Sequence, residues 1–532
     1  MPLHSSPPAV GSASSPCSRV GGWLATAVAV ASIGTLLAAP WFAQELLPCA
    51  WLGVAAGLFM ATGRRGWRGE LSVLAAAVVV VASASQWTPE SLAHCMRSDA
   101  WVGWAFAAPI VLWDACRMAL PFWCVCRAGG DPRASWLLAA LVAVVAEAFV
   151  PAVFPWKMGY LHLAWPVLVQ SADLAGAEGS TFLFYATGGA LITLATPLLG
   201  LAGRRVPVAG YAALAVCAAN IVYGSVALSR HAALAAAAPK LRVALVQVNP
   251  ERHDAIDDLR RLTRAVCAGP RPPALVCWPE CSGGSYEDGL ESFTDPDAVV
   301  RRSRPPQRGL RPLPDPVCHL VLGGKIYRGY PERPRQIFQS ALLVDQAERL
   351  VGQYHKRHLM PFGEYVPGGD LIPDLRLYFP MENEFSVGGD ATVLDCGKAR
   401  LGAMLCYEDM IPAAAASLVG RGANLLVSLI NGSAFTNPLT LVQHRLLAQL
   451  RAVENRRCLV RCAATGETCV IAATGAVTER LPLTVEDVLL VDVPLLEGRT
   501  VANVAAGWFP VACGLGLVVW LVRSGAAWRA AA

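Results

Sequence analysis

The stretch "LGAMLCYEDMIP" (residues 401–412) joins a run of apolar residues to two acids. Its first five residues have the pattern of a buried β-strand, and Cys406 follows where that run ends. A cysteine in this position is either a small core residue or a nucleophile held on the bend between a strand and a loop. Because free cysteines are more often buried as small hydrophobic residues, the surrounding sequence has to decide between the two.

The segments around this stretch alternate between strand-like and helix-like patterns. Strands are expected at 241–250, 274–280, 320–327, 340–345, 399–409 and 423–432, and helices at 254–266, 411–420 and 438–456. Such alternation predicts an α/β domain, in which polar groups gather beyond the carboxyl ends of the strands. Glu280, Cys406 and Asn431 lie at such ends, so we expect these side chains to converge.

The chain as a whole is too apolar for a soluble protein. It has 532 residues, of which 55% are hydrophobic and 16% charged, whereas ordinary soluble domains carry about 25% charged residues. A helix that crosses a bilayer needs about 20 apolar residues. Eight runs approach that length: 22–44, 47–63, 70–86, 101–126, 134–154, 180–201, 206–228 and 505–523. The sequence therefore predicts seven membrane-crossing helices before the α/β domain and one after it.

Basic residues beside these runs predict the orientation of the chain, because cytoplasmic loops carry an excess of Lys and Arg. If the N-terminus is cytoplasmic, nine arginines fall on the cytoplasmic side: Arg64, Arg65, Arg68, Arg127, Arg133, Arg204, Arg205, Arg523 and Arg529. Two basic residues, Arg97 and Lys157, fall on the opposite side. We expect a membrane domain over 1–230, a periplasmic α/β domain over 231–504, and a last helix with a short cytoplasmic tail over 505–532.

The net charge and the cysteines indicate which ligands and covalent links to expect. The net charge of +5 comes mostly from the loop arginines, so no nucleic acid is expected as a partner. No spacing of Cys and His predicts a zinc site, and we expect neither a metal nor a cofactor. Ten of the seventeen cysteines fall on the outer side, where disulfides can form, although the sequence assigns no pairing: Cys95, Cys267, Cys277, Cys281, Cys318, Cys396, Cys406, Cys458, Cys462 and Cys469.

Three segments carry reactive groups in settings that suit catalysis. Glu280 in "WPECSGG" (278–284) precedes a glycine loop, and Lys356 lies among apolar and aromatic residues in "YHKRHLMPFGEYVP" (354–367). A nucleophilic cysteine needs a base for its proton and a positive charge that favours the thiolate. Glu280 would be that base, and Lys356 would lower the pKa of Cys406 and stabilise an oxyanion. The residues alone equally allow a loop-capping acid, a surface lysine and a packing cysteine.

Together these motifs resemble a known family. The order of Glu280, Lys356 and Cys406 is similar to the triad of the nitrilase (carbon–nitrogen hydrolase) superfamily. More closely, "HLMPFGEYVP" and "LCYE" resemble the apolipoprotein N-acyltransferase family, and so do "FPWKMGY" (154–160) and "GAEGSTFL" (176–183) in the membrane part. The resemblance implies a multi-span α-helical membrane domain with a periplasmic, nitrilase-like αββα sandwich, located in the bacterial inner membrane.

The resemblance also implies roles for individual residues. Glu280 would be the general base, Lys356 the oxyanion stabiliser and Cys406 the nucleophile. Three further residues would support the lysine or shape the site: Glu364, Tyr407 and Glu408. A second group matches the family's scaffold helix and strand, but a salt-bridged structural helix is at least as good an interpretation of it: Arg451, Glu454 and Arg461.

The implied reaction moves an acyl chain from a phospholipid, with phosphatidylethanolamine as the expected donor, to Cys406 and then to the N-terminal amine of a diacylated lipoprotein. The expected partners are therefore the membrane, the phospholipid donor and the lipoprotein acceptor, and we expect a monomer. Two alternatives stay open. One is a membrane-tethered amidase of the same superfamily, which uses water as acceptor, and the other is a non-catalytic scaffold or transporter with a degenerate enzyme domain. Retention of the triad and its neighbours argues against the second.

Four stretches bear on how lipid would fit. Residues 431–435 read Asn-Gly-Ser-Ala-Phe, without the acid and tryptophan of the family's Asn-Asp-Ala-Trp-Phe, and 246–257 lacks the family's tryptophan. In the family, both stretches lie near the entrance to the lipid-binding site. We therefore expect the catalytic residues to work as in the family, whereas the sequence does not decide how well lipid substrates fit. The loops at 281–318 and 366–390 are candidate lids, and an ordinary surface loop explains 366–390 equally well.

Overall fold

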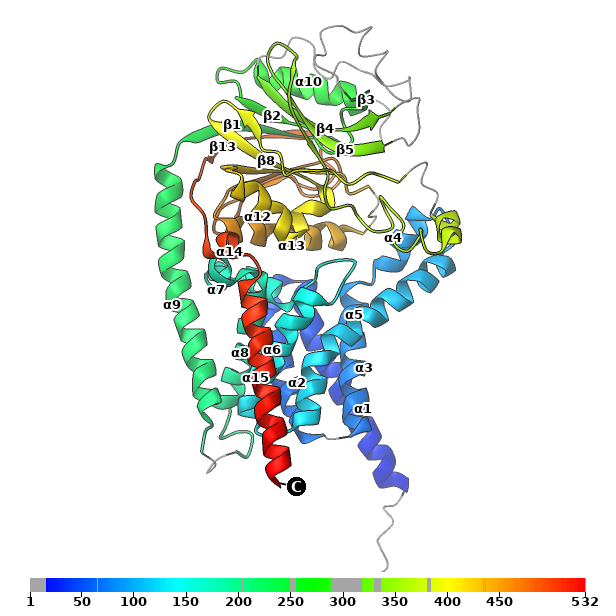
Figure 1. Ribbon diagram of the computed structural model, residues 1–532, viewed down its shortest axis with the longest axis vertical. Helices are drawn as coiled ribbons and strands as arrows, with labels where there is room; N and C mark the ends of the chain where they lie inside the picture. Colours follow the sequence, from blue (N-terminus) through cyan, green and yellow to red (C-terminus); the bar gives the residue numbers. More distant parts are fainter. Residues whose placement is uncertain are drawn as a thin grey trace, which may run out of the picture.

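The computed structural model describes residues 16–64, 66–201, 205–248, 255–288, 318–329, 336–379, 384–433, 435 and 437–531. The molecule has two parts, a bundle of helices and a layered α/β domain that sits on one end of the bundle (Figure 1).

The helical part begins with three long helices and continues through shorter and longer ones to the end of the chain. Its elements are α1 (Pro16–Ala38), α2 (Leu47–Gly63), α3 (Trp67–Ala84), α4 (Thr88–Cys95), α5 (Ala100–Ala128), α6 (Pro132–Phe149), α7 (Pro166–Val169), α8 (Ala172–Leu194), α9 (Val208–Ala237), α14 (Val501–Val504) and α15 (Trp508–Ala531). Within the described ranges, six segments are long and apolar enough to cross a membrane: Leu24–Trp41, Gln44–Gly63, Trp67–Ala84, Ala100–Ala128, Pro132–Phe149 and Val208–Ala237. The protein is therefore a multi-span membrane protein.

Two more helices occupy the places of the remaining expected spans. The first, α8, carries Asp173 and Glu178 and is kinked at Gly176, where φ is +68° and a Cβ atom would lie 2.9 Å from the Glu178 carboxylate. Glycine adopts this left-handed conformation without steric cost. The other, α15, contributes a shorter apolar stretch, Trp508–Ser524, and the count of seven spans plus one stays a prediction.

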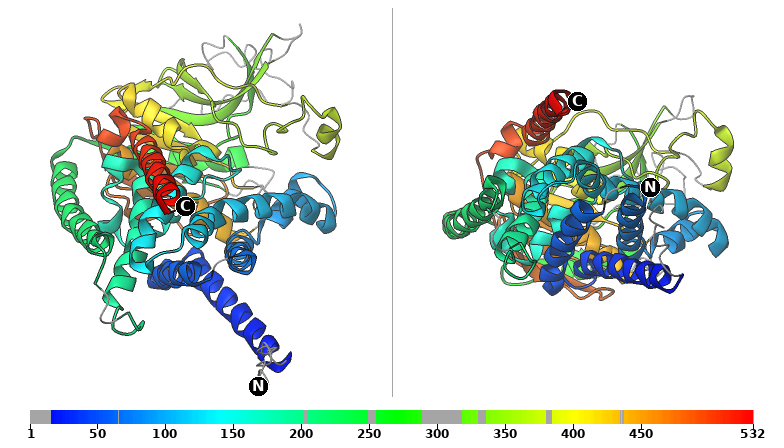
Figure 2. Two further views of the ribbon diagram at one scale, coloured as in Figure 1. Left: turned by 60° about the horizontal axis from the view of Figure 1, so that its bottom comes forward. Right: turned by 90° about the horizontal axis from the view of Figure 1, so that it is seen from below.

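The loops that join the helices away from the α/β domain lie near one another. Arg127 at the end of α5 pairs with Glu70 near the start of α3 at 2.6 Å, and an Arg133 guanidinium nitrogen donates to the Arg205 carbonyl oxygen at 3.2 Å. The C-terminal end of α15 lies at this same end of the bundle (Figures 1 and 2). The basic loops therefore share the face that is remote from the sheets.

Two sheets form the centre of the α/β domain. The first has the strand order β13-β1-β2-β4-β5-β6, with β3 beside β4, and the second has the order β12-β11-β10-β9-β8-β7. The strands of the first sheet are β1 (Lys240–Gln247), β2 (Leu275–Cys277), β3 (Ser285–Glu287), β4 (His319–Arg328), β5 (Gln336–Val344), β6 (Leu350–His355) and β13 (Asp487–Pro494). Those of the second are β7 (Leu394–Cys396), β8 (Ala399–Leu405), β9 (Leu425–Ile430), β10 (Leu459–Ala463), β11 (Cys469–Ile471) and β12 (Val477–Arg480).

Helices cover the outer face of each sheet. The inner faces pack against each other through residues such as Leu245, Leu343 and Leu405, which share one apolar core. The first sheet is covered by α10 (Ala255–Cys267) and the second by α12 (Pro412–Gly420) and α13 (Pro438–Asn455) (Figure 1). The predicted αββα sandwich is thus confirmed, because each central strand is buried on both faces as its apolar run requires.

The α13 layer rests directly on the helical part. Leu446, Leu450 and Val453 of α13 belong to the same apolar core as the membrane helices. Arg456, just after α13, pairs with Asp173 of α8 at 2.6 Å, and both side chains are buried. The Ala177 N–H of α8 donates to Glu454 at 2.9 Å. The interpretation of the α13 region as a salt-bridged scaffold fits this packing, in which Arg451 also pairs with Glu454 at 3.0 Å.

Candidate active site

Cys406 lies on a sharp bend directly after β8. It begins the short 3-10 helix η5 (Cys406–Met410), and its φ of +47° is in the left-handed region that non-glycine residues seldom adopt. Its side chain is only 6% exposed, and its thiol donates to the Asn431 carbonyl oxygen at 3.7 Å. A strained position of this kind persists only where the surroundings hold it in place.

Asp409, in the η5 turn that Cys406 begins, stabilises this bend through hydrogen bonds to three neighbouring elements. Its carboxylate accepts hydrogen bonds from Ser428 at 2.8 Å and Arg461 at 2.9 Å, and it lies 2.8 Å from His444 Nε2. Burial alone would raise the pKa of Asp409, but the Arg461 guanidinium and His444 outweigh burial and lower that pKa to about 2. No local sequence pattern predicts this role for Asp409. Only the fold brings its partners together, since they come from β9, β10 and α13.

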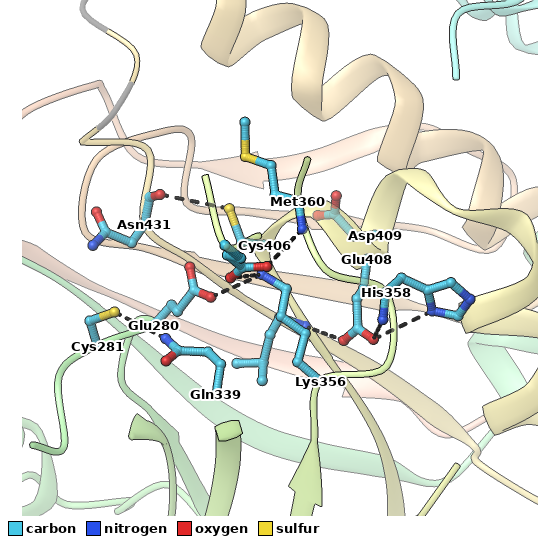
Figure 3. Close-up of polar contacts among 12 residues, drawn as sticks. Glu280, Cys281, Gln339, Lys356, His358, Met360, Cys406, Glu408, Asp409 and Asn431 are labelled. Carbon is cyan, nitrogen blue, oxygen red and sulfur yellow. Dashed lines mark hydrogen bonds and ion pairs between the residues drawn. The ribbon is translucent and has the colours of Figure 1, made fainter. Parts of the chain in front are cut away.

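Glu280 and Lys356 lie buried beside Cys406 (Figure 3), and the partly buried Glu364 completes an ionic cluster with them. Glu280 follows β2 and Lys356 follows β6, so the first sheet carries both, while the second sheet carries Cys406. The Lys356 ammonium donates to Glu280 Oε1 at 3.3 Å and to Glu364 Oε1 at 2.7 Å. The other oxygen of Glu364 accepts the Met360 N–H at 2.8 Å. The strand ends at Glu280, Cys406 and Asn431 converge as predicted, and Lys356 joins them from the end of β6.

The environment sets the protonation of this cluster. Burial would lower the pKa of Lys356, but the carboxylates of Glu280 and Glu364 outweigh it and hold that pKa well above its usual range. Burial is the main reason that the pKa of Glu280 is raised, and Glu364 adds to the effect while Lys356 opposes it. The site thus holds a firmly charged lysine beside a carboxyl group that binds a proton more readily than usual.

The pKa of Cys406 differs from the sequence-based expectation. Lys356 does favour the thiolate, but burial and the nearby Glu280 carboxylate have the larger effect and raise the pKa of Cys406 well above its usual range. The resting nucleophile is therefore a neutral thiol, and a base has to remove its proton during attack.

Glu408 links the nucleophile bend to the lysine segment. One of its oxygens accepts from the Leu405 N–H at 3.0 Å. The other accepts from the Tyr354 hydroxyl at 2.7 Å and the Arg357 N–H at 2.8 Å. Because Arg357 follows Lys356 directly, Glu408 fixes the position of the lysine relative to Cys406, and its side chain is fully buried.

Tyr407 points the other way, toward the helical part. Its hydroxyl donates to the Val153 carbonyl oxygen at 2.7 Å, and burial raises its pKa to about 12. Its ring lies 6.5 Å from that of Phe154. The residue next to the nucleophile is therefore tied to the loop that follows α6.

A narrow, mostly apolar cavity lies beside Met360, between the two parts of the molecule. Its lining includes Trp87, Leu92 and Phe154 from the helical part and Met360, Phe362 and Phe435 from the α/β domain. Trp87 packs edge-on against Phe154 at 5.2 Å and against Phe435 at 5.8 Å between ring centres. No sequence pattern marked Trp87 as a residue of this cavity, because its position depends on packing between distant segments.

The candidate lids are only partly described. The segment 366–390 is described except for 380–383, and it carries Leu371 and Leu377, whose side chains are 85% and 80% exposed. Most of the loop at 281–318 lies outside the described residues. Within the described chain, no group of three or more His, Cys, Asp or Glu residues could hold a metal ion.

Each of the two parts of the molecule matches the model of a known protein family. Residues 33–190 match the family model "Apolipoprotein N-acyltransferase N-terminal domain", and residues 242–503 match "Carbon-nitrogen hydrolase". Among solved structures, the chain is similar to Saccharomyces cerevisiae Nit3 of the nitrilase superfamily, with 20% identity, a TM-score of 0.35 and coverage of 48% of this chain and 90% of that one. An amidase from Nesterenkonia sp. gives 23% identity, a TM-score of 0.33 and coverage of 49% and 93%.

Curated relatives match across the junction between the two parts. The chain is 32% identical over 387 residues to the apolipoprotein N-acyltransferase of Geobacter metallireducens, which covers 70% of each chain. It is 27% identical over 437 residues to that of Pseudomonas putida, which covers 80% of this chain and 79% of that one. The chain therefore belongs to the apolipoprotein N-acyltransferase family of enzymes.

Proposed function

We propose that the protein transfers an acyl chain from a phospholipid, through a thioester on Cys406, to the N-terminal amine of the diacylglyceryl-cysteine of lipoproteins. The observation that carries the proposal is the position of Cys406. It lies beside a buried acid and lysine, and the neighbouring Tyr407 contacts the helical part of a multi-span membrane protein. A nucleophile at this junction suits substrates that are anchored in a bilayer.

The first half-reaction uses the donor. Glu280 takes the proton of the Cys406 thiol while the sulfur attacks the ester carbonyl carbon, with phosphatidylethanolamine as the expected donor and its sn-1 ester as the expected bond. The Lys356 ammonium stabilises the oxyanion, and Glu364 keeps that ammonium charged. The lysophospholipid alcohol then leaves with the proton held by Glu280, whose raised pKa suits both steps.

The second half-reaction uses the acceptor. The neutral α-amino group attacks the thioester carbonyl, Glu280 accepts the amine proton and passes it to the departing sulfur, and the amide product leaves. The free thiol is restored, so no net proton change remains on the enzyme. The cavity lined by Trp87, Phe154 and Met360 supports this assignment, because a mostly apolar lining between the two parts of the molecule favours a lipid substrate over a polar one.

We place the α/β domain on the periplasmic side of the bacterial inner membrane. The support is the shared face of the basic loops, on which Arg127 and Arg133 lie at the end of the bundle remote from the sheets. The exposed Leu371 and Leu377 suit contact with the membrane surface, and a lid role for 366–390 stays a prediction.

Intact mass of the detergent-purified protein tests the donor step. After incubation with phosphatidylethanolamine, the wild-type protein is expected to gain the mass of one acyl chain, hydroxylamine is expected to remove it, and Cys406→Ala is expected to gain nothing. No adduct on the wild-type protein, together with hydrolysis of a small amide by Cys406, would replace this proposal with the membrane-tethered amidase.

A further inference from the structure

A pair of thiols lies far from the nucleophile, on the first sheet and its covering helix. Cys267 is the last residue of α10, and Cys318 directly precedes β4. Their sulfur atoms are 3.5 Å apart. Cys318 is fully buried, whereas Cys267 is half-buried and therefore open to a reagent in solution.

Regular structure fixes the backbone at both positions. Trp278 after β2 donates from its indole N–H to Thr263 of α10 at 2.9 Å, which ties the last turns of that helix to the sheet. The His319 N–H, next to Cys318, donates to the Ala274 carbonyl oxygen at 3.2 Å, and His319 is the register partner of Leu275 in β2. A disulfide needs its sulfurs about 2 Å apart, and the two thiols are already in contact at 3.5 Å.

We propose that Cys267 and Cys318 form a disulfide in the mature protein. This inference rests on the periplasmic placement of the α/β domain given under the proposed function, since that compartment is oxidising. The oxidant is a protein or small-molecule disulfide of the periplasm. The Cys267 thiolate attacks one sulfur of the oxidant, which breaks the S–S bond of the oxidant, releases its other sulfur as a thiolate and leaves a mixed disulfide on Cys267. The Cys318 thiol then loses its proton and attacks the Cys267 sulfur, which forms the Cys267–Cys318 bond and expels the second sulfur of the oxidant. Two electrons have then passed to the oxidant, whose two sulfurs end as thiols.

The surroundings of the pair suit this order of events. The hydrogen bond from Cys318 lowers the pKa of Cys267, while the same contact, together with burial, raises the pKa of Cys318. The half-exposed sulfur is thus the more acidic of the two and meets the oxidant first, and the buried sulfur is the one that resolves the mixed disulfide.

The disulfide would stabilise the part of the first sheet, β2 and β4, that packs against Glu280. It joins the chain ahead of β2 to the start of β4, and β4 contains Gly323, where a Cβ atom would lie only 2.6 Å from the Glu280 Cα atom. Closing this long loop covalently restricts the unfolded chain, so reduction is expected to lower the thermal midpoint by several degrees.

The test is a peptide map of the full-length protein, with free thiols blocked by alkylation at the moment of cell lysis. We expect a peptide that links Cys267 to Cys318 and an intact mass about 2 Da below that of the reduced protein. Cys267→Ser and Cys318→Ser should each lose the linked peptide, and the control Cys458→Ser should keep it. Reduction should lower the thermal midpoint of the wild-type protein and leave that of Cys318→Ser unchanged.

The outcomes separate this inference from the proposed function. If both thiols are alkylated in protein that still forms the acyl adduct on Cys406, the disulfide is wrong and the acyltransferase proposal stands. A link from Cys318 to any other cysteine also overturns the inference. If the linked peptide is present but no acyl adduct forms, the disulfide stands and the proposed reaction fails.

Discussion

At the scale of single residues, Cys406 is expected to be irreplaceable as the acyl carrier. Cys406→Ser should form acyl adduct at least about 1000-fold more slowly than the wild type, because a serine hydroxyl is far less acidic than a thiol and Glu280 is too weak a base for it. Its thermal midpoint should change little, since the two side chains differ by one atom. Adduct formation by Cys406→Ser at a rate near that of the wild type would refute the role of sulfur.

Glu280 should set the lower limb of the pH–rate profile. Only its carboxylate form accepts the thiol proton, and burial raises its pKa, so the rate of adduct formation should rise with pH through a value above the ordinary 4.5 of a glutamate and then level off. Glu280→Gln should lower the rate by about 100-fold or more and abolish this limb. A Gln variant that keeps the same limb would assign the titration to another group.

At the scale of secondary-structure elements, Asp409 should stabilise the η5 bend against acid. Its pKa is lowered from the ordinary 3.8 to about 2, so its stabilising contribution is complete above pH 3.8 and is lost as the pH falls toward 2. That contribution is about 2 kcal/mol. Thermal midpoints measured across this range should fall for the wild type and fall less for Asp409→Asn. Ser428→Ala, which removes one hydrogen bond of the same network, should keep the wild-type pH dependence.

The secondary-structure elements also show which features of the site could be predicted from the sequence and which could not. Glu280 and Cys406 each follow an apolar strand, and strand ends of an α/β domain converge, so their meeting could be foreseen. Lys356 follows β6, whose sequence LVGQYH has no apolar run, so its place beside them was predicted from the order of the family's triad and not from a strand pattern. The pKa of Cys406 could not, because it depends on how deeply the fold buries the thiol. The contacts of Asp409 with His444 and Arg461 join three separate elements, and no local pattern marks such a network.

At the scale of the whole molecule, the buried pair of Arg456 and Asp173 should hold the two parts together. Arg456→Ala leaves the Asp173 carboxylate buried without its partner and should cost about 3–5 kcal/mol of stability. Arg480→Ala is the matched control, because Arg480 is 68% exposed in its 3.2 Å pair with Glu467 and should cost under about 1 kcal/mol. Equal effects of the two variants on the thermal midpoint in detergent would show that the junction does not depend on this pair.

The packing of the two parts also places side chains that the sequence could not assign. Trp87 and Phe154 belong to the helical part, yet they line the cavity beside Met360 of the α/β domain. Hydropathy foresees the helices that carry or flank them. It does not foresee which of their residues face the α/β domain, since that depends on how the bundle and the α13 layer fit together.

The most direct test of the central claim is a single-turnover chase of the acylated enzyme. Wild-type protein carrying the acyl chain on Cys406 is freed of phospholipid and mixed with a diacylglyceryl-cysteine peptide, and the masses of enzyme and peptide are followed together. Transfer through the thioester predicts that the enzyme loses one acyl mass as the peptide gains it on its α-amino group, while an N-acetylated peptide gains nothing. Loss of the adduct as free fatty acid at the same rate with or without the peptide would contradict the account and identify water as the acceptor.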